Sequence, residues 1–280
     1  DAMAIANKAG VINMNGGETL ITRAFPTLTM VMPLGIPKGE YFQVYAPNQN
    51  ENIYTNDWLG PFYGYERVIE TFQLTESPLR LKPIDIYYHT YSASKTASLR
   101  ALDKVYAWAL TQETTPVHVS AYVRKVLDFN RIVVARTRDG WRVRGAENLR
   151  ELRAPLSLGQ PTIDPQSGTA GFNRHGNSHY LHLADDEASV RFNPSANTRL
   201  ATPYLVSANA RVTSASSGDK QTINLALAGE VPLKFSLAMA PHCAVSADGR
   251  AMRAGSRTGN ISHFSVPQHA IGELRVHCVQ

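Results

Sequence analysis

The residue of this sequence best suited to chemistry is His89, near the end of the stretch Ile84–Ser92 (IDIYYHTYS). A buried strand of an α/β sheet normally reads as an apolar run. This stretch begins in that way, and His89 and Tyr91 follow toward its carboxyl end, the edge where α/β folds bind ligands. An imidazole changes its charge near neutral pH, which suits acid–base catalysis. A hydrogen-bonded structural histidine explains the pattern equally well.

Aromatic residues concentrate just before this stretch. Half of the chain's 24 aromatic residues lie between Tyr41 and Tyr91, and they are densest in the segment Asn56–Tyr65 (NDWLGPFYGY). Loops rich in Gly and Pro often carry function, and flat aromatic faces suit sugar rings. Alternatively, the aromatic side chains of this loop pack against one another and bind no ligand.

Metal-ligand patterns are scarce. The first half holds only His89 and His118, and the chain has no Gly-rich phosphate loop and no Gly-x-Ser-x-Gly motif. In the second half, His175 and His179 belong to the stretch RHGNSHYLH. In an extended strand these two positions would lie about 13 Å apart. A turn at His-Gly-Asn-Ser-His could instead bring them together around a metal ion.

The charge is unevenly distributed. Residues 129–280 hold 17 Lys/Arg and 11 Asp/Glu, a net charge of +6, whereas residues 1–128 hold 11 and 12, a net charge of −1. Arg136, Arg138, Arg142 and Arg144 surround the expected turn Asp139–Gly140, as on the outer face of a hairpin. A basic face could meet an acidic polymer or nucleic acid. Because no nucleic-acid motif accompanies it, we predict a solvated face and no nucleic-acid partner.

The start of the chain, its apolar runs and its cysteines give less information about function. The start reads as a helix that closes at Gly10, which suggests the back part of a longer polypeptide. Apolar runs such as Leu28–Leu34 are too short to span a bilayer, so we predict no membrane span. Cys243 and Cys278 both fall in strand-like segments, and either a disulfide or two buried thiols fits them.

Periodicity divides the chain near Phe129. Before it, strand-like and helical patterns alternate, which favours a parallel α/β sheet or barrel. The expected strands are 27–32, 41–46, 84–91 and 115–119, the expected helices are 64–74, 92–112 and 120–127, and a turn is expected at 33–39. After it, short alternating runs predict an antiparallel β-sandwich that opens with a hairpin at 132–144.

Three stretches together are similar to a known family. Residues 16–26 (GGETLITRAFP), 56–65 and 84–95 (IDIYYHTYSASK) resemble the rear part of the deacetylase region of PelA-type proteins, the bifunctional periplasmic proteins of Pel exopolysaccharide synthesis. The helix over 97–112 and the β-domain from residue 132 match the end of that region. These proteins in turn resemble the NodB-type polysaccharide deacetylases, which have a (β/α) barrel-like domain.

This resemblance implies roles for particular residues. NodB-type enzymes hold a divalent metal, usually zinc, with an Asp and a His-x-x-x-His pair, and a late His protonates the departing amine. Carried across, His89 is this general acid, Arg23 orients the base, and Asp57 is a further catalytic candidate. The implied substrate-binding residues are Trp58, Tyr63 and Tyr91.

The sequence also departs from the family. No Asp-Asp motif precedes these stretches and the early His pair is absent, so we expect this chain to lack the metal site and the base and to be inactive alone. The expected fold is a partial α/β (β/α) barrel-like segment over 1–129 followed by an all-β sandwich over 130–280. The resemblance implies a periplasmic location, and an exopolysaccharide of the biofilm matrix, export-complex proteins or the missing front part as partners. The rival interpretation is a carbohydrate- or partner-binding β-sandwich module of an export complex.

Overall fold

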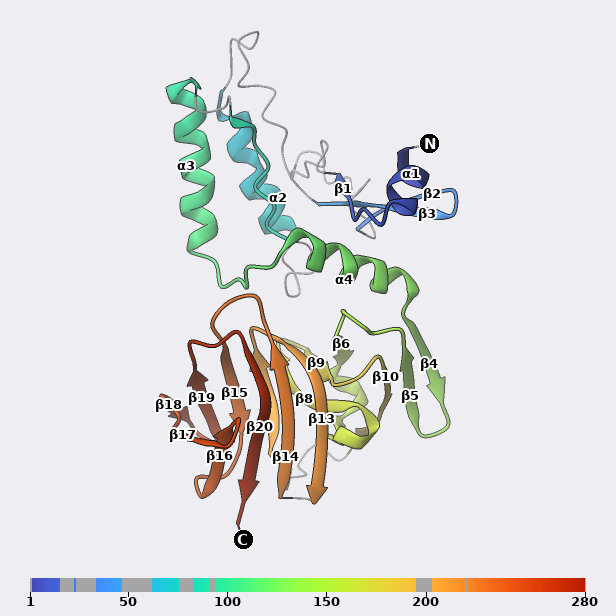
Figure 1. Ribbon diagram of the computed structural model, residues 1–280, viewed down its shortest axis with the longest axis vertical. Coiled ribbons are helices and arrows are strands. Elements are labelled where there is room, and N and C mark those ends of the chain that lie inside the picture. Colours follow the sequence, from blue (N-terminus) through green and yellow to red (C-terminus); the bar gives the residue numbers. More distant parts are fainter. Residues whose placement is uncertain are drawn as a thin grey trace. The chain divides into compact units, whose positions relative to one another are not determined.

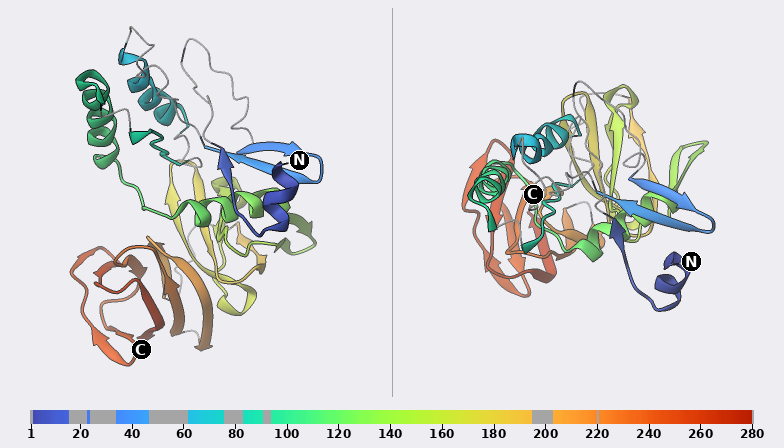
Figure 2. Two further views of the ribbon diagram at one scale, coloured as in Figure 1. Left: turned by 45° about the horizontal axis from the view of Figure 1, so that its top comes forward. Right: turned by 90° about the horizontal axis from the view of Figure 1, so that it is seen from above.

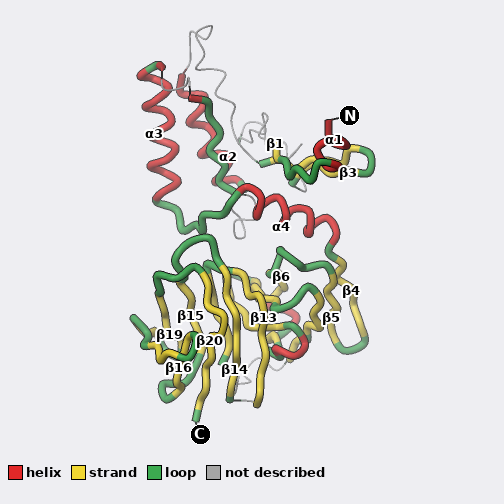
Figure 3. Tube along the Cα trace, in the orientation of Figure 1, coloured by secondary structure: helices red, strands yellow, loops and turns green. Residues whose placement is uncertain are grey.

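The computed structural model of this chain contains two compact units (Figure 1). It describes residues 2–15, 23, 34–46, 62–75, 83–90, 94–194, 203–219 and 221–279, with the backbone alone for 62–64. The first unit comprises Asp1–Thr114 and Val119–Leu127, and the second comprises Thr115–His118 and Asp128–Gln280. Strand accounts for 44% and helix for 24%, so the chain is mostly β-sheet. Most helices belong to the first unit and most strands to the second (Figure 3).

The first unit opens with the helix expected from the sequence. Helix α1 (Ala2–Lys8) ends at Gly10, whose φ is +67°. The amide of Gly10 donates to Asn7 O and that of Val11 donates to Ala6 O, the paired bonds of a Schellman cap. The remaining elements are β1 (Met14–Asn15), β2 (Gly35–Lys38), β3 (Tyr41–Tyr45), the 3-10 helix η2 (Phe62–Arg67), α2 (Val68–Leu74), α3 (Thr96–Leu110) and α4 (Val119–Arg131).

The expected (β/α) barrel is not found among the described residues. Strands β1, β3 and β2 form a small sheet in that order, in which β1 and β3 run parallel over two residue pairs and β2 pairs antiparallel with β3. Residues 83–89 and 113–118 have no regular structure, so the strands predicted at 84–91 and 115–119 are wrong. The predicted turn at 33–39 contains β2, and the strand predicted at 27–32 lies outside the described residues.

The core of the first unit forms between helices. It consists of the buried side chains of Tyr65, Val68, Phe72, Ala101, Leu102 and Val105. Helix α3 does not bury all of its leucines in this core, and Leu99 and Leu110 lie outside it. Those two leucines are 42% and 83% exposed, while Ser98 is buried. The helix therefore uses a face rotated toward its small residues, which allow close approach to α2 and η2.

A three-stranded sheet opens the second unit. Strands β4 (Val133–Thr137) and β5 (Gly140–Arg144) form the predicted hairpin, and β10 (Glu187–Val190) pairs with β5. The turn is Arg138–Asp139, one residue earlier than expected, because Thr137 pairs with Gly140. The prediction of one outer arginine face is therefore wrong. With this register Arg136 faces the same side as Trp141, whereas Arg142 and Arg144 face the other side.

Two larger sheets form the rest of the second unit (Figure 2). The seven-stranded sheet has the order β18-β19-β15-β12-β8-β9-β6, and the five-stranded sheet has the order β13-β14-β20-β16-β17. The bounds are β6 (Glu151–Pro155), β8 (Thr169–His175), β9 (Ser178–Leu183), β12 (Tyr204–Ala208), β13 (Arg211–Asp219), β14 (Thr222–Ala228), β15 (Lys234–Ala238), β16 (Cys243–Ala247), β17 (Arg250–Met252), β18 (Ser256–Thr258), β19 (Ile261–Ser265) and β20 (Ala270–Cys278). A separate pair joins β7 (Gln160–Pro161) and β11 (Phe192–Asn193), and the 3-10 helices are η4 (Leu156–Leu158) and η5 (Pro165–Ser167).

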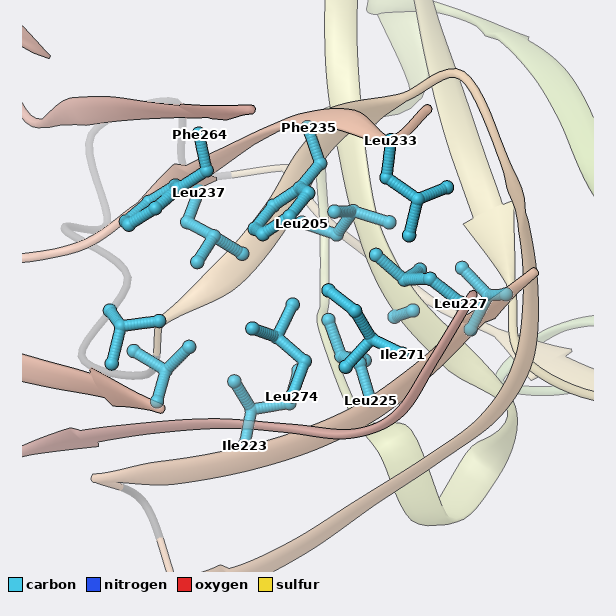
Figure 4. Close-up of a cluster of buried hydrophobic side chains, with 14 of the residues drawn as sticks. Leu205, Ile223, Leu225, Leu227, Leu233, Phe235, Leu237, Phe264, Ile271 and Leu274 are labelled. Carbon is cyan, nitrogen blue, oxygen red and sulfur yellow. The ribbon is translucent and has the colours of Figure 1, made fainter. Parts of the chain in front are cut away.

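The main core lies between these two sheets. Leu205, Phe235 and Leu237 come from the seven-stranded sheet and meet Leu225 and Leu274 of the five-stranded sheet (Figure 4). Alternate residues of β14 point into this core, as a period of two predicts, whereas on β20 a bulge interrupts the alternation between Ile271 and Leu274. The second unit is thus an all-β unit built from two packed sheets.

The two cysteines form a disulfide. Cys243 on β16 lies opposite Cys278 on β20, and their Cα atoms are 4.0 Å apart. The amides of Cys243 and Cys278 donate to Ala240 O and Gln221 O, so the cysteines are a non-hydrogen-bonded cross-strand pair, whose side chains approach closely. Of the two states that the sequence allowed, the structure contains the disulfide.

Gly171 is required where β8 and β12 meet. A Cβ atom at this position would lie 1.9 Å from Leu205 O and 2.7 Å from Leu205 N. We expect Gly171→Ala to lower the free energy of unfolding of the all-β unit by about 3 kcal/mol, because the backbone of β12 must move. Gly218→Ala is the matched control, since no heavy atom lies within 4 Å of its Cβ position. Equal loss in both variants, measured by chemical denaturation, would contradict this prediction.

Candidate functional site

The segment that carries His89 is anchored from one side. Ile84 and Ile86 are half-buried and pack against the core of the first unit. Tyr87 and Tyr88 follow with 38% and 44% of their surface exposed. The apolar start that suggested a strand therefore serves to fix an irregular segment on the helices, and the polar residues beyond it face solvent.

Tyr87 is the side chain that contacts His89. Its hydroxyl oxygen lies 3.3 Å from Nε2 of His89, and the two rings meet edge to face with centroids 5.2 Å apart. The Tyr65 hydroxyl donates to the carbonyl oxygen of Tyr87 at 2.8 Å. Because Tyr65 is only 2% exposed, this bond ties the His89 segment to the buried core. The imidazole is thus held by a neighbour whose own backbone is fixed.

Further tyrosines surround this segment. Burial, followed by the charge of Asp85, raises the pKa of Tyr122, and the Tyr122 hydroxyl donates to Tyr45 O at 3.5 Å. Burial, followed by a hydrogen bond with Tyr88, raises the pKa of Tyr106, and the rings of Tyr88 and Tyr106 meet edge to face. These two phenols therefore remain neutral at physiological pH. They offer hydroxyl groups and ring faces, which suit an uncharged hydroxylated ligand.

Of the other catalytic and substrate-binding candidates, only Arg23 has a described side chain, and its partner is Glu70. The guanidinium of Arg23 is 81% exposed and its Nε lies 4.0 Å from Oε1 of Glu70, while its backbone amide donates to the same oxygen at 3.0 Å. Asp57, Trp58 and Tyr91 lie outside the described residues, as does the side chain of Tyr63. Among the predicted catalytic and substrate-binding residues, the structure therefore describes the surroundings of His89 and Arg23 alone.

The alternative metal pair in the second unit is separated by the strand register. His175 pairs with Ser178, and His179 pairs with Arg174, so the two histidines face opposite sides of the β8–β9 hairpin. His179 is 8% exposed and meets Phe172 edge to face, whereas His175 contacts Tyr180. Burial lowers the pKa of His179. The turn does bring the strands together, but it does not make a chelating pair.

No metal-binding group occurs in the described parts of the chain. Their His, Cys, Asp and Glu side chains form no cluster of three or more that could hold an ion.

The sequence alone did not identify Tyr87 as the contact of His89, nor Tyr65 as the residue that bonds to the backbone of Tyr87. The available signal was the spacing of Tyr87 and His89, because residues two apart in an extended segment project to the same side. The bond from Tyr65 had no local signal, since it joins residues 22 positions apart.

Comparison with known proteins does not extend this description. No protein-family model, no curated protein and no solved structure matches the chain. Among the described residues, no helix has the length and apolar character that crossing a membrane requires.

Proposed function

We propose that this chain is the rear part of a metal-dependent polysaccharide N-deacetylase. Its substrate would be the N-acetylated amino sugars of an exopolysaccharide of the Pel type, modified during biofilm matrix synthesis and export. Under this proposal the first unit completes a (β/α) barrel-like domain, and the chain alone is inactive. The observation that carries the proposal is the His89–Tyr87 pair, fixed to the core through Ile84, Ile86 and Tyr65.

His89 would act as the general acid. Hydrolysis of an acetamide breaks its C–N bond, and the leaving nitrogen must gain a proton as the amine departs. A protonated imidazole supplies that proton, and the 3.3 Å contact with the Tyr87 hydroxyl would orient the ring for the transfer. The neutral tyrosines nearby would contact the sugar through hydrogen bonds and ring faces.

The described residues do not supply the site for the metal ion that this function requires. Those residues contain no cluster of three or more potential ligands, so by themselves they do not fit a metal ion. Zinc and the catalytic base would be supplied by the parent polypeptide.

A periplasmic location follows from the same proposal. The Cys243–Cys278 disulfide supports it, because such bonds persist in oxidising compartments. Exopolysaccharide and other proteins of the export complex would be the partners there.

Acetate release from N-acetylated amino-sugar oligomers tests the proposed reaction. We expect the parent protein to release acetate, to lose this activity in a strong chelator and to regain it with zinc. This chain by itself should release no acetate. Acetate release by this chain alone, or activity of the parent that resists chelation, would contradict the proposal.

A second candidate function is carbohydrate or partner binding by the all-β unit. The observation in its favour is a polar depression of about 130 Å³ whose lining includes Gln166, Asp185, Glu187 and Thr213. Retardation of the chain in gels that contain the exopolysaccharide, abolished by Thr213→Trp, would support this function.

A further inference from the structure

A second depression lies on the three-stranded sheet of β4, β5 and β10 (labelled in Figure 1). Its volume is about 100 Å³, enough for one small polar group together with water. The lining residues are Thr137, Asp139, Gly140, Trp141, Arg142, Ser189, Val190 and Arg191. All of them belong to the second unit.

The strand register tells which lining side chains face the depression. Trp141 and Val190 pair with each other and face the buried cluster of Val143. Arg142 pairs with Ser189, and these two face the opposite, outer side, as does Thr137. The outer side thus offers one guanidinium and two hydroxyl groups around the backbone of β5.

Gly140 allows a second guanidinium to approach. A Cβ atom on Gly140 would lie 2.3 Å from Val190 O and 3.2 Å from Cγ of Arg191. The stem of Arg191 therefore lies against the bare backbone of Gly140, on the side where a side chain would project. The guanidinium of Arg191 forms no ion pair or hydrogen bond with any described residue, whereas the backbone carbonyl of Arg191 accepts a hydrogen bond from the Thr162 amide.

The charges around the depression are positive in sum. Arg142 and Arg144 both pair with Glu187, at 2.8 Å and 3.4 Å. Arg191 has no such partner among the described residues, and Asp139 is the one acidic residue in the lining. Arginine is the side chain best suited to bind a carboxylate through two parallel hydrogen bonds.

We propose that this depression binds the carboxylate of a uronic acid unit in an acidic polysaccharide. Arg191 and Arg142 would hold the carboxylate, and Thr137 and Ser189 would donate to it or to sugar hydroxyls. Asp139 would accept from a sugar hydroxyl. Asp139 and Glu187 reduce the excess of positive charge around the depression. A singly charged carboxylate therefore fits it better than a doubly charged phosphate does. The proposal does not depend on the deacetylase function, since it concerns another unit and an anionic ligand.

Titration of the intact chain with oligogalacturonate, followed by calorimetry, tests this site. We expect saturable binding that weakens about tenfold in Arg191→Ala and more in Arg191→Ala/Arg142→Ala, because each removes a charged hydrogen-bond donor. Methyl-esterified oligogalacturonate should not bind, since it keeps the sugar rings but lacks the negative charge.

Arg250→Ala is the matched control variant. Arg250 is also an exposed strand arginine whose side chain has no partner among the described residues. It lies on β17 of the five-stranded sheet. Its affinity for oligogalacturonate should stay within about twofold of the unmodified chain. Three results would overturn the proposal: no binding at all, equal weakening in Arg250→Ala and Arg191→Ala, or tighter binding of polyphosphate than of oligogalacturonate.

Discussion

Replacing His89 with alanine in the parent enzyme should lower kcat for acetate release by about 10²- to 10⁴-fold. This is the usual contribution of a positioned general acid, which is lost when no group protonates the departing amine. KM should change little, because Tyr87, Tyr88 and Tyr106 would still contact the sugar. The measurement is steady-state acetate release across pH, with thermal unfolding of each variant recorded in parallel.

Controls separate this role from a structural one. His269→Ala removes an exposed histidine of the second unit and should leave kcat unchanged. Tyr87→Phe keeps the ring but removes the hydroxyl that lies 3.3 Å from His89 Nε2. It should lower kcat less than the loss of His89 does, because the imidazole remains and only its orienting contact is lost. An unchanged kcat in the His89 variant would show that the assignment of the general acid is wrong.

Loss of the disulfide should destabilise the all-β unit by about 4 kcal/mol. Cys243 and Cys278 are 35 residues apart, and opening a loop of that length restores chain entropy to the unfolded state. We expect Cys243→Ser/Cys278→Ser to show this loss, and the unmodified chain in reductant to show the same. Hydrogen exchange of the β14, β16 and β20 amides measures it, because these amides report the five-stranded sheet rather than the whole chain.

A neighbouring substitution controls for the added hydroxyl groups. Ala244→Ser places a serine at an exposed position of β16 without touching the bond, and its effect should be below about 0.5 kcal/mol. If reductant leaves the exchange rates of these strands unchanged, the disulfide does not stabilise the unit and the prediction is wrong.

Local pattern was sufficient for many elements. The short alternating runs expected after Phe129 do form strands, such as Tyr204–Ala208 and Thr222–Ala228. The hairpin over 132–144 and the helix after Ser94 are also present. These elements are readable because side-chain alternation or helical spacing reflects burial on one face, which each segment shows by itself.

The first unit shows where the pattern fails. Residues 84–91 have the composition of a strand, yet a strand also needs a neighbour with open hydrogen-bonding groups, and no described strand pairs with them. Ile84 and Ile86 bury their side chains against helices instead. Apolar composition predicts that a segment is buried. It does not predict whether the segment forms a strand or packs against helices without regular structure.

The sequence by itself thus determined several strands of the second half and the long helix α3, and it singled out His89 as a candidate acid. Tertiary structure alone decided that Tyr87 and Tyr65 hold the His89 segment, that Cys243 meets Cys278, and that Arg191 lies against Gly140. The physical reason is the same for most of these contacts. Pairing register and packing join residues that are distant along the chain, and no local period records which of them will meet.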